Sequence, residues 1–197
     1  MRALLATLCL CLAAPALAGG PKTEGPRPGE AAPAFSLTDQ DGKAHQLKDF
    51  LGKVVVLEWT NPECPFVVRH YRKDTMEALA KKYAGKDVVW LAINSSHFAN
   101  NAVNKKWAEA ERLPFKVLDD HTGATGHAYG ARTTPDMYVI DPAGKIAYRG
   151  AIDDDPYGDK ASPKNFVDTA LMQHFSGKPV GEARTKPYGC SVKYASN

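Results

Sequence analysis

The feature that most constrains the fold is a buried strand followed closely by a helix that begins at a cysteine. The run KVVVLEW, residues 53–59, is almost continuously apolar and rich in β-branched residues, which is typical of a strand buried on both faces of a sheet. After Cys64 and Pro65, apolar residues recur at helical spacing as far as Gly85. Proline suits the first turn of a helix, because the N–H that it lacks would be unpaired there. The sequence therefore predicts one long helix with Cys64 at its N-terminal end.

The rest of the chain alternates predicted strands and helices. A hairpin is expected over residues 34–47, where apolar and polar residues alternate around Asp41-Gly42. Further strands are expected over residues 87–94, over 115–120, and on both sides of a turn at 142–145; helices are expected over 100–113, near 122–131, and over 162–177, the last with Ser162 as its cap. This order predicts an α/β sandwich with a mixed central sheet and helices on both faces.

The N-terminal residues indicate export. Residues 1–18 combine a basic Arg2, an apolar run and the small-residue pattern Ala16-Leu17-Ala18, which together predict a signal peptide cut after about Ala18. A membrane anchor is the alternative, but the apolar run is shorter than the ~20 residues that a span needs. A mobile Gly/Pro-rich leader is expected over residues 19–32, a single domain over 33–177 and a C-terminal tail over 178–197. The expected location is the periplasm or the exterior, with no membrane contact after cleavage.

Removal of residues 1–18 leaves two cysteines, Cys64 and Cys190. Disulfides persist outside the cytoplasm, so the two cysteines are expected to form a structural bridge or a reactive pair, unless Cys190 is an independent thiol. A thiol at the N-terminal end of a helix has a lowered pKa, because unpaired amides and the helix dipole stabilise its anion. Neither spacing for a vicinal disulfide is present, because Val67 and Asn61 stand where the second cysteine would be. Any disulfide cycle within one chain therefore needs Cys190.

Charge and histidine spacing exclude other classes of function. The formal net charge is +3 at pH 7 without a concentrated basic stripe, which argues against nucleic acid as a partner. The six histidines show no pair at the spacing of a helical zinc motif, so no resident metal is expected.

Three segments resemble the peroxiredoxin-like redoxins grouped under alkyl hydroperoxide reductase and thiol-specific antioxidant. They are PAFSLTDQDGKAHQLKDFLGKVVVLEW, NPECPFV and TTPDMYVIDPAGKIAYRG, and the likeness spans about residues 32–177. The resemblance implies a thioredoxin-like three-layer sandwich with an N-terminal β-hairpin. It also implies that Cys64 is the active cysteine, with Pro65 beside it, and that Thr134-Pro135 is a cis-proline pair that contacts substrate. The ending GCSVKY is similar to one found in this subgroup, which supports a resolving role for Cys190.

The peroxidase signature that the resemblance implies is incomplete. Such enzymes place a threonine three residues before the active cysteine and an arginine at the start of the later strand. Here Thr60 stands four residues before Cys64, and Arg132 stands two residues before Thr134, which occupies the arginine position. Thr60 and Arg132 are therefore kept as candidate catalytic residues only if the loops shift.

These observations predict an exported thiol oxidoreductase without a prosthetic cofactor. Cys64 is expected to attack a peroxide or a protein disulfide as its thiolate, and Cys190 or an external thiol is expected to resolve the product. The partner is then an exported thiol reductant or a disulfide substrate protein, and the sequence leaves the oligomeric state open. The alternatives are a redoxin-fold module that binds a soft metal such as copper through Cys64 and Cys190, and a disulfide-bridged adaptor.

Overall fold

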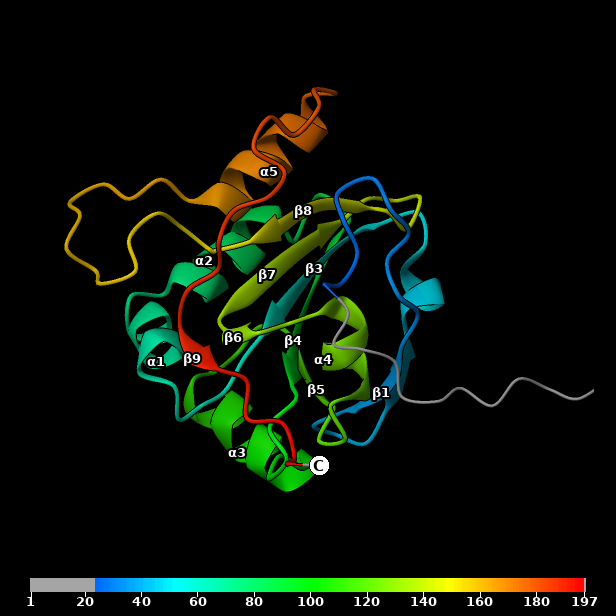
Figure 1. Ribbon diagram of the computed structural model, residues 1–197, viewed down its shortest axis with the longest axis vertical. Coiled ribbons are helices and arrows are strands. Elements are labelled where there is room, and N and C mark those ends of the chain that lie inside the picture. Colours follow the sequence, from blue (N-terminus) through cyan, green and yellow to red (C-terminus); the bar gives the residue numbers. More distant parts are fainter. Residues whose placement is uncertain (1–23, 197) are drawn as a thin grey trace, which may run out of the picture.

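A seven-stranded mixed sheet forms the centre of the computed structural model, which describes residues 24–196 (Figure 1). The strand order is β2-β1-β5-β4-β3-β7-β8, and a separate two-stranded sheet joins β6 and β9. The strands are β1 (Ser36–Asp39), β2 (Ala44–Gln46), β3 (Val54–Trp59), β4 (Val88–Asn94), β5 (Lys116–Asp119), β6 (Thr133–Thr134), β7 (Asp136–Ile140), β8 (Ile146–Gly150) and β9 (Cys190–Ser191). The helices are η1 (Leu47–Phe50), α1 (Pro65–Arg72), α2 (Thr75–Tyr83), α3 (Asn101–Ala110), α4 (Ala124–Tyr129) and α5 (Phe166–Phe175).

The central strand is β3, as its unbroken apolar run predicts. It pairs in parallel with β4 and antiparallel with β7, and all six of its residues are buried. The pair β4–β5 is parallel, whereas β1–β2, β1–β5 and β7–β8 are antiparallel. The carboxyl end of β3 therefore lies in the middle of the sheet, and the loop that follows it carries Cys64.

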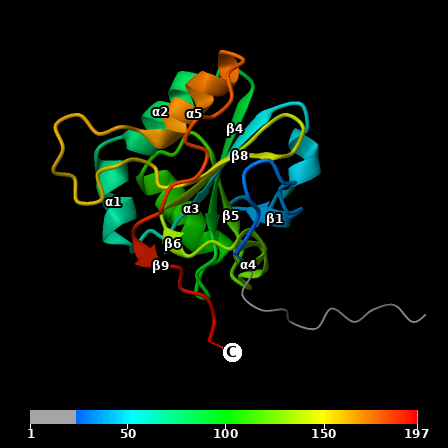
Figure 2. The same cartoon turned by 45° about the horizontal axis from the view of Figure 1, so that its top comes forward.

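Helices cover both faces of this sheet (Figure 2), which confirms the predicted fold class. One core lies under α1, α2, α3 and α5, where Tyr71 packs edge-on against Trp107. The other core lies under α4, η1 and the N-terminal segment, where Trp59 contacts Tyr129 and Tyr138. Alternate residues of β3 supply the two cores, as expected for a strand covered on both sides.

The predicted long helix after Cys64 is interrupted. It ends at Arg72, and α2 begins at Thr75 after Asp74, whose φ of 52° is left-handed. Tyr71 and Met76 are both buried, although residues five apart in an unbroken helix point about 140° apart. The interruption lets both side chains face the sheet. Aspartate is one of the few residue types besides glycine that adopt this conformation readily.

The N-terminal cap of α5 also differs from the prediction. Asn165, not Ser162, caps this helix, because the Asn165 side chain accepts a hydrogen bond of 2.8 Å from the amide of Asp168. Ser162 and Pro163 lie outside the helix and are exposed.

The expected mobile leader is partly held on the domain. Residues 24–32 run along β8, where Gly29 N donates to Ile146 O and Ile146 N donates to Glu30 O. The side chain of Arg149 donates to the carbonyl oxygens of Glu24 and Pro26. These contacts to the backbone order the segment. Its sequence suggested mobility because it lacks any apolar period. The predicted signal peptide and residues 19–23 lie outside the described residues.

The C-terminal tail lies across the domain. From the end of α5 it passes β8, pairs with β6 and continues beyond α4 (Figures 1 and 2). Arg149 N donates to Ala183 O, and Val192 N donates to Arg132 O. The predicted C-terminal tail is therefore an ordered part of the structure as far as residue 196.

Candidate active site

Cys64 occupies the end of the loop that joins β3 to α1. The Asn61 side chain accepts from Glu63 N at 2.8 Å, and the Asn61 carbonyl accepts from Cys64 N at 3.0 Å, which closes this loop into a tight turn. Cys64 is the N-cap of α1, and Pro65 takes the first helical position as predicted. Only 2% of Cys64 is exposed.

Two groups lie directly against the Cys64 sulfur. Its Sγ is 3.0 Å from the carbonyl oxygen of Thr134 and 2.8 Å from Sγ of Cys190. Both cysteines are free thiols. The Thr134–Pro135 peptide bond is cis, as the resemblance implied. The structure thus brings together four of the residues singled out in the sequence, Cys64, Thr134, Pro135 and Cys190.

Backbone pairing positions Cys190 over Cys64. β9 pairs antiparallel with β6 so that Cys190 lies opposite Thr134. Gly189, the residue before it, has a φ of 139°, and a Cβ added there would lie 2.0 Å from the Thr134 carbonyl oxygen. Only glycine permits this approach, since any side chain would push the two strands apart.

Polar and aromatic contacts anchor the tail on both sides of Cys190. Before it, the Tyr188 hydroxyl donates to Asp153 Oδ1 and lies 3.0 Å from Nε2 of His70. After it, the Tyr194 hydroxyl donates to Ala131 O at 2.8 Å, and its ring stacks on His127. These contacts fix Cys190 from two directions.

The two thiols have opposite electrostatic environments. Burial raises the pKa of Cys64, but favourable interactions of its sulfur with Cys190, with Thr134 and with the Val67 backbone outweigh it, so this pKa is below its usual value. Burial, together with the hydrogen bond to Cys64 and its charge, raises the pKa of Cys190 to about 11. At a given pH, Cys64 therefore has the larger thiolate fraction of the two and is the better nucleophile, while Cys190 holds its proton near neutral pH.

The neighbouring histidine is uncharged at neutral pH. His70 lies on α1 and is 2% exposed. Burial lowers its pKa to about 4; Asp153 opposes this shift, and Arg69 adds to it. His70 therefore adds no positive charge beside Cys64. Its contact with Tyr188 contributes to holding the tail.

The candidate peroxide-binding residues make their contacts with other groups. Thr60 is buried beside Glu58 and Tyr71. Arg132 is exposed, its amide donates to Asp136, and its side chain lines a cavity shared with the tail. Among residues 24–196, no hydrogen bond joins either side chain to Cys64. The catalytic roles of Thr60 and Arg132 therefore stay predictions.

Residues 28–149 match the AhpC/TSA family over more than half of the chain. The chain belongs to the AhpC/TSA family. It is a peroxiredoxin-like redoxin with a thioredoxin-like fold, as the sequence motifs predicted.

Relatives of this AhpC/TSA-family protein carry two kinds of name. A thiol-disulfide oxidoreductase ResA from Geobacillus thermodenitrificans is 32% identical over 118 residues, which cover 60% of this chain and 66% of the relative. A chloroplastic peroxiredoxin Q from Populus jackii is 30% identical over 156 residues, covering 73% of this chain and 65% of the relative. The chain thus spans slightly less than two thirds of the length of each.

The fold has a well-matched solved neighbour. An uncharacterised conserved protein from Geobacillus kaustophilus superposes with a TM-score of 0.78 at 31% identity, covering 86% of this chain and 93% of that one. The match extends beyond the family segment 28–149, so the architecture is shared over most of the chain.

Sequence reasoning missed a buried acid and the anchor of the tail. Glu58 in β3 is fully buried, where Oε1 accepts from Tyr71 and Oε2 accepts from Trp90. Burial raises the pKa of Glu58 to about 8. The lone acid within VVVLEW was the available signal. Asp153, in the loop after β8, is 6% exposed and accepts from Tyr188. No sequence pattern indicated this pairing.

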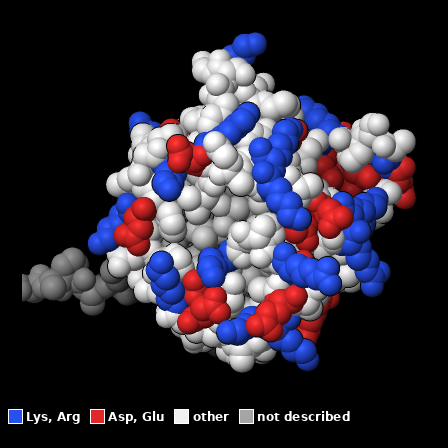
Figure 3. All heavy atoms as spheres, turned by 180° about the vertical axis from the view of Figure 1, so that it is seen from behind, with Lys and Arg blue, Asp and Glu red and all other residues white. Residues whose placement is uncertain are grey.

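Other features of the described chain bear on the alternatives. No cluster of three or more histidine, cysteine or acidic side chains suited to a metal ion occurs within residues 24–196. No helix in that range is long and apolar enough to cross a membrane. Figure 3 shows positive and negative side chains interspersed over one face of the molecule.

Proposed function

We propose that this protein is an exported thiol oxidoreductase that exchanges a disulfide with a protein or small-molecule partner through Cys64 and Cys190. The observation that carries the proposal is the 2.8 Å contact between the two sulfurs. It joins a thiol of lowered pKa to one of raised pKa, which is the asymmetry that a nucleophile and a resolving thiol need.

The reaction begins with the Cys64 thiolate. It attacks one sulfur of the partner disulfide, which breaks the partner's S–S bond, forms a mixed disulfide and releases one partner thiolate that takes up a proton. The mixed disulfide removes the negative charge from Cys64, so one cause of the raised pKa of Cys190 is lost. Cys190 then gives up its proton and attacks Cys64 Sγ, which releases the second partner thiol. The partner gains two electrons, the protein holds a Cys64–Cys190 disulfide, and an external thiol reductant restores the dithiol.

Disulfide exchange is favoured over peroxide reduction. The paired thiols support disulfide exchange, whereas no hydrogen bond within residues 24–196 joins the Thr60 or Arg132 side chain, the candidate peroxide-binding groups, to Cys64. A second candidate function is a copper site, which would use the same two sulfurs. Within residues 24–196, no group of three or more histidine, cysteine or acidic side chains is arranged to hold a metal ion.

The tail must move during the cycle. Cys64 is 2% exposed and lies beneath Cys190, so a protein disulfide reaches it only when β9 leaves β6. The pairing spans two residues on each strand, so separation leaves the seven-stranded sheet intact.

Mass spectrometry with thiol alkylation tests the proposal. The reduced protein is incubated with an oxidised dithiol, quenched with an alkylating reagent and compared with Cys64→Ser and Cys190→Ser. The wild type should lose both labelled thiols, Cys190→Ser should accumulate a mixed disulfide on Cys64, and Cys64→Ser should not react. If the Cys64→Ser protein turned over at the wild-type rate, the mechanism would be wrong. The N-terminal mass of protein recovered from outside the cytoplasm tests export and cleavage near Ala18.

A further inference from the structure

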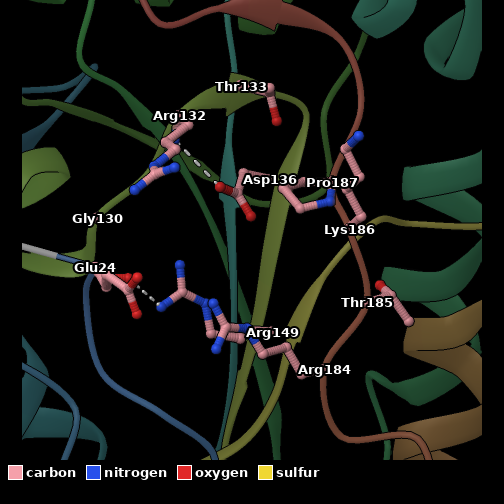
Figure 4. A pocket seen from close by; sticks show the side chains of 10 residues that line it. All are labelled: Glu24, Gly130, Arg132, Thr133, Asp136, Arg149, Arg184, Thr185, Lys186 and Pro187. Carbon is pink, nitrogen blue, oxygen red and sulfur yellow. Dashed lines mark hydrogen bonds between the residues drawn. The ribbon is translucent and has the colours of Figure 1, made fainter.

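A charged cavity of about 540 Å³ lies between the domain and the tail, away from the cysteines (Figure 4). Its lining residues come from the N-terminal segment, the stretch before β6, β7, β8 and the tail; they are Glu24, Gly130, Arg132, Thr133, Asp136, Arg149, Arg184, Thr185, Lys186 and Pro187. Thr133 lines the cavity, whereas Thr134 contacts Cys64. The Thr134 contact is made by its backbone carbonyl oxygen, and neither Cys64 nor Cys190 is among the residues that line the cavity.

Positive side chains outnumber carboxyl groups in this cavity, because Arg132, Arg149, Arg184 and Lys186 line it together with only Glu24 and Asp136. Arg149 and Arg184 are partners in a parallel β-bridge, so two positively charged side chains extend from adjacent backbone positions. Figure 4 shows the Arg132 guanidinium directed toward the same part of the cavity. None of the salt bridges within residues 24–196 involves these three arginines. Like charges at adjacent strand positions destabilise each other unless an anion lies between them.

Arg149 is the most constrained of these cations. It is 8% exposed, and its Nη1 donates to the carbonyl oxygens of Glu24 and Pro26, at 2.8 and 2.9 Å. Its guanidinium also lies over the Tyr138 ring. Carbonyl groups and a ring face orient the cation but do not neutralise it, and a buried charge is stabilised chiefly by an opposite one.

Asp136 does not supply the missing counter-charge. It is 1% exposed, and its Oδ2 accepts from the Arg132 amide at 3.3 Å. Within the described chain, its Oδ1 is buried and has no hydrogen-bond partner. Burial raises its pKa to about 7, which leaves this carboxyl largely protonated below neutrality. It is then an unpaired polar group in the wall of a cationic cavity, able to donate a hydrogen bond to an oxygen of a ligand.

We propose that this cavity binds a small organic anion with at least two carboxylate or phosphate groups, held by Arg132, Arg149 and Arg184. The volume lies within the roughly 300–1,000 Å³ of small-molecule sites, and one inorganic oxyanion would fill a small part of it. Guanidinium groups bind carboxylates and phosphates by paired hydrogen bonds, so several of them favour a ligand with more than one acidic group.

The ligand would connect the tail to the domain. Arg149 belongs to β8, whereas Arg184 lies on the tail, six residues before Cys190. An anion bound between the two guanidinium groups attracts both of them and so replaces their mutual repulsion where the tail meets β8. The bound state therefore favours the docked tail, which covers Cys64. This consequence for the thiol rests on the proposed function, whereas binding itself does not.

Calorimetric titration with citrate tests the site, and Lys178, which is exposed and lies outside the cavity, provides a matched control on the same tail. Arg184→Gln should weaken citrate binding by about tenfold or more, since it removes charge-assisted hydrogen bonds, while Lys178→Gln should change it by less than about threefold. Asp136→Asn should bind at least as tightly as the wild type, because the amide keeps a hydrogen-bond donor in the cavity wall and carries no charge at any pH. Absence of saturable binding, or equal losses in Arg184→Gln and Lys178→Gln, would overturn the site.

Two further measurements complete the test. Inorganic phosphate and acetate are titrated alongside citrate, and equal affinity for phosphate would overturn the assignment to an organic anion with several acidic groups. The same titration in Cys190→Ser should give unchanged citrate affinity, which separates failure of the site from failure of the redox proposal. In the reduced wild type, saturating citrate should slow alkylation of Cys64, and Arg184→Gln should abolish this effect. Unchanged alkylation in saturated wild type would overturn the link between the cavity and the tail.

Discussion

Tyr188, two positions before Cys190 in the chain, donates a hydrogen bond to the carboxylate of Asp153. Cys190 itself contacts Cys64. Asp153 belongs to the loop that follows β8, and it also accepts from Asp155 N. The tail is thus fastened to a loop of the domain that is itself ordered. This contact, together with those of Tyr194, limits how often Cys64 becomes accessible, because β9 adds only a two-residue pairing.

Tyr188→Phe should therefore expose Cys64 more often. The change leaves a buried carboxylate short of one donor, at a cost of about 1–2 kcal/mol, which corresponds to a roughly 5–30-fold increase in the open population. The measurement is the rate of alkylation at Cys64 in the reduced protein, with the label located by mass spectrometry. Tyr157→Phe is the matched control, because Tyr157 is 77% exposed. Equal rates in the two variants would show that Tyr188 does not hold the tail.

Gly189→Ala should weaken the Cys64–Cys190 disulfide. A methyl group at this position meets the Thr134 carbonyl oxygen, and the backbone conformation is unfavourable for alanine, so β9 must move away from β6. We expect the dithiol–disulfide equilibrium in a glutathione buffer to shift toward the dithiol by about tenfold or more. Gly181→Ala is the control in the same tail, since its nearest neighbouring atom is 3.7 Å away. A shift of the same size in both variants would argue against a requirement for close strand approach.

The local features of the site were predictable from the sequence, and the long-range ones were not. The apolar run of β3, the proline after Cys64 and the Thr134-Pro135 pair are short patterns with a physical cause or a family likeness, and each predicted its element correctly. The contact between Cys64 and Cys190 spans 126 positions. It depends on Gly189 and on tail contacts with distant residues, which no periodicity encodes. The break at Asp74 was missed because it arises from how two buried side chains meet the sheet.

Glu58→Gln should reduce the loss of stability with rising pH. The folded protein holds the Glu58 proton up to about pH 8, whereas the unfolded chain releases it near the ordinary value of 4.5. Between these values the folded state binds more protons, so the free energy of unfolding falls as pH rises, by an amount on the order of 5 kcal/mol. Glutamine does not titrate and removes this contribution.

Urea unfolding of Glu58→Gln at pH 5, 6.5 and 8 measures the effect. The amide nitrogen of glutamine would face a hydrogen-bond donor from Tyr71 or Trp90. This cost of the substitution is the same at every pH. The difference between the variant and the wild type should therefore shift in favour of the variant as pH rises. Glu63→Gln, at an exposed position in the loop before α1, serves as the control. Parallel pH profiles for the wild type and Glu58→Gln would mean that Glu58 is ionised in the folded protein.

Asn165→Ala should destabilise the protein more than Ser162→Ala. The Asn165 side chain accepts from the amide of Asp168 and satisfies one unpaired donor at the start of α5, whereas Ser162 is exposed and lies three residues earlier. Loss of such a cap costs about 1 kcal/mol, and an exposed serine away from a cap changes the free energy of unfolding by less than about 0.5 kcal/mol. Urea unfolding of the two variants makes the comparison directly. If Ser162→Ala were the more harmful change, α5 would begin where its sequence alone predicts, and the packing of Val167 and Leu171 against the sheet would have to be reassigned.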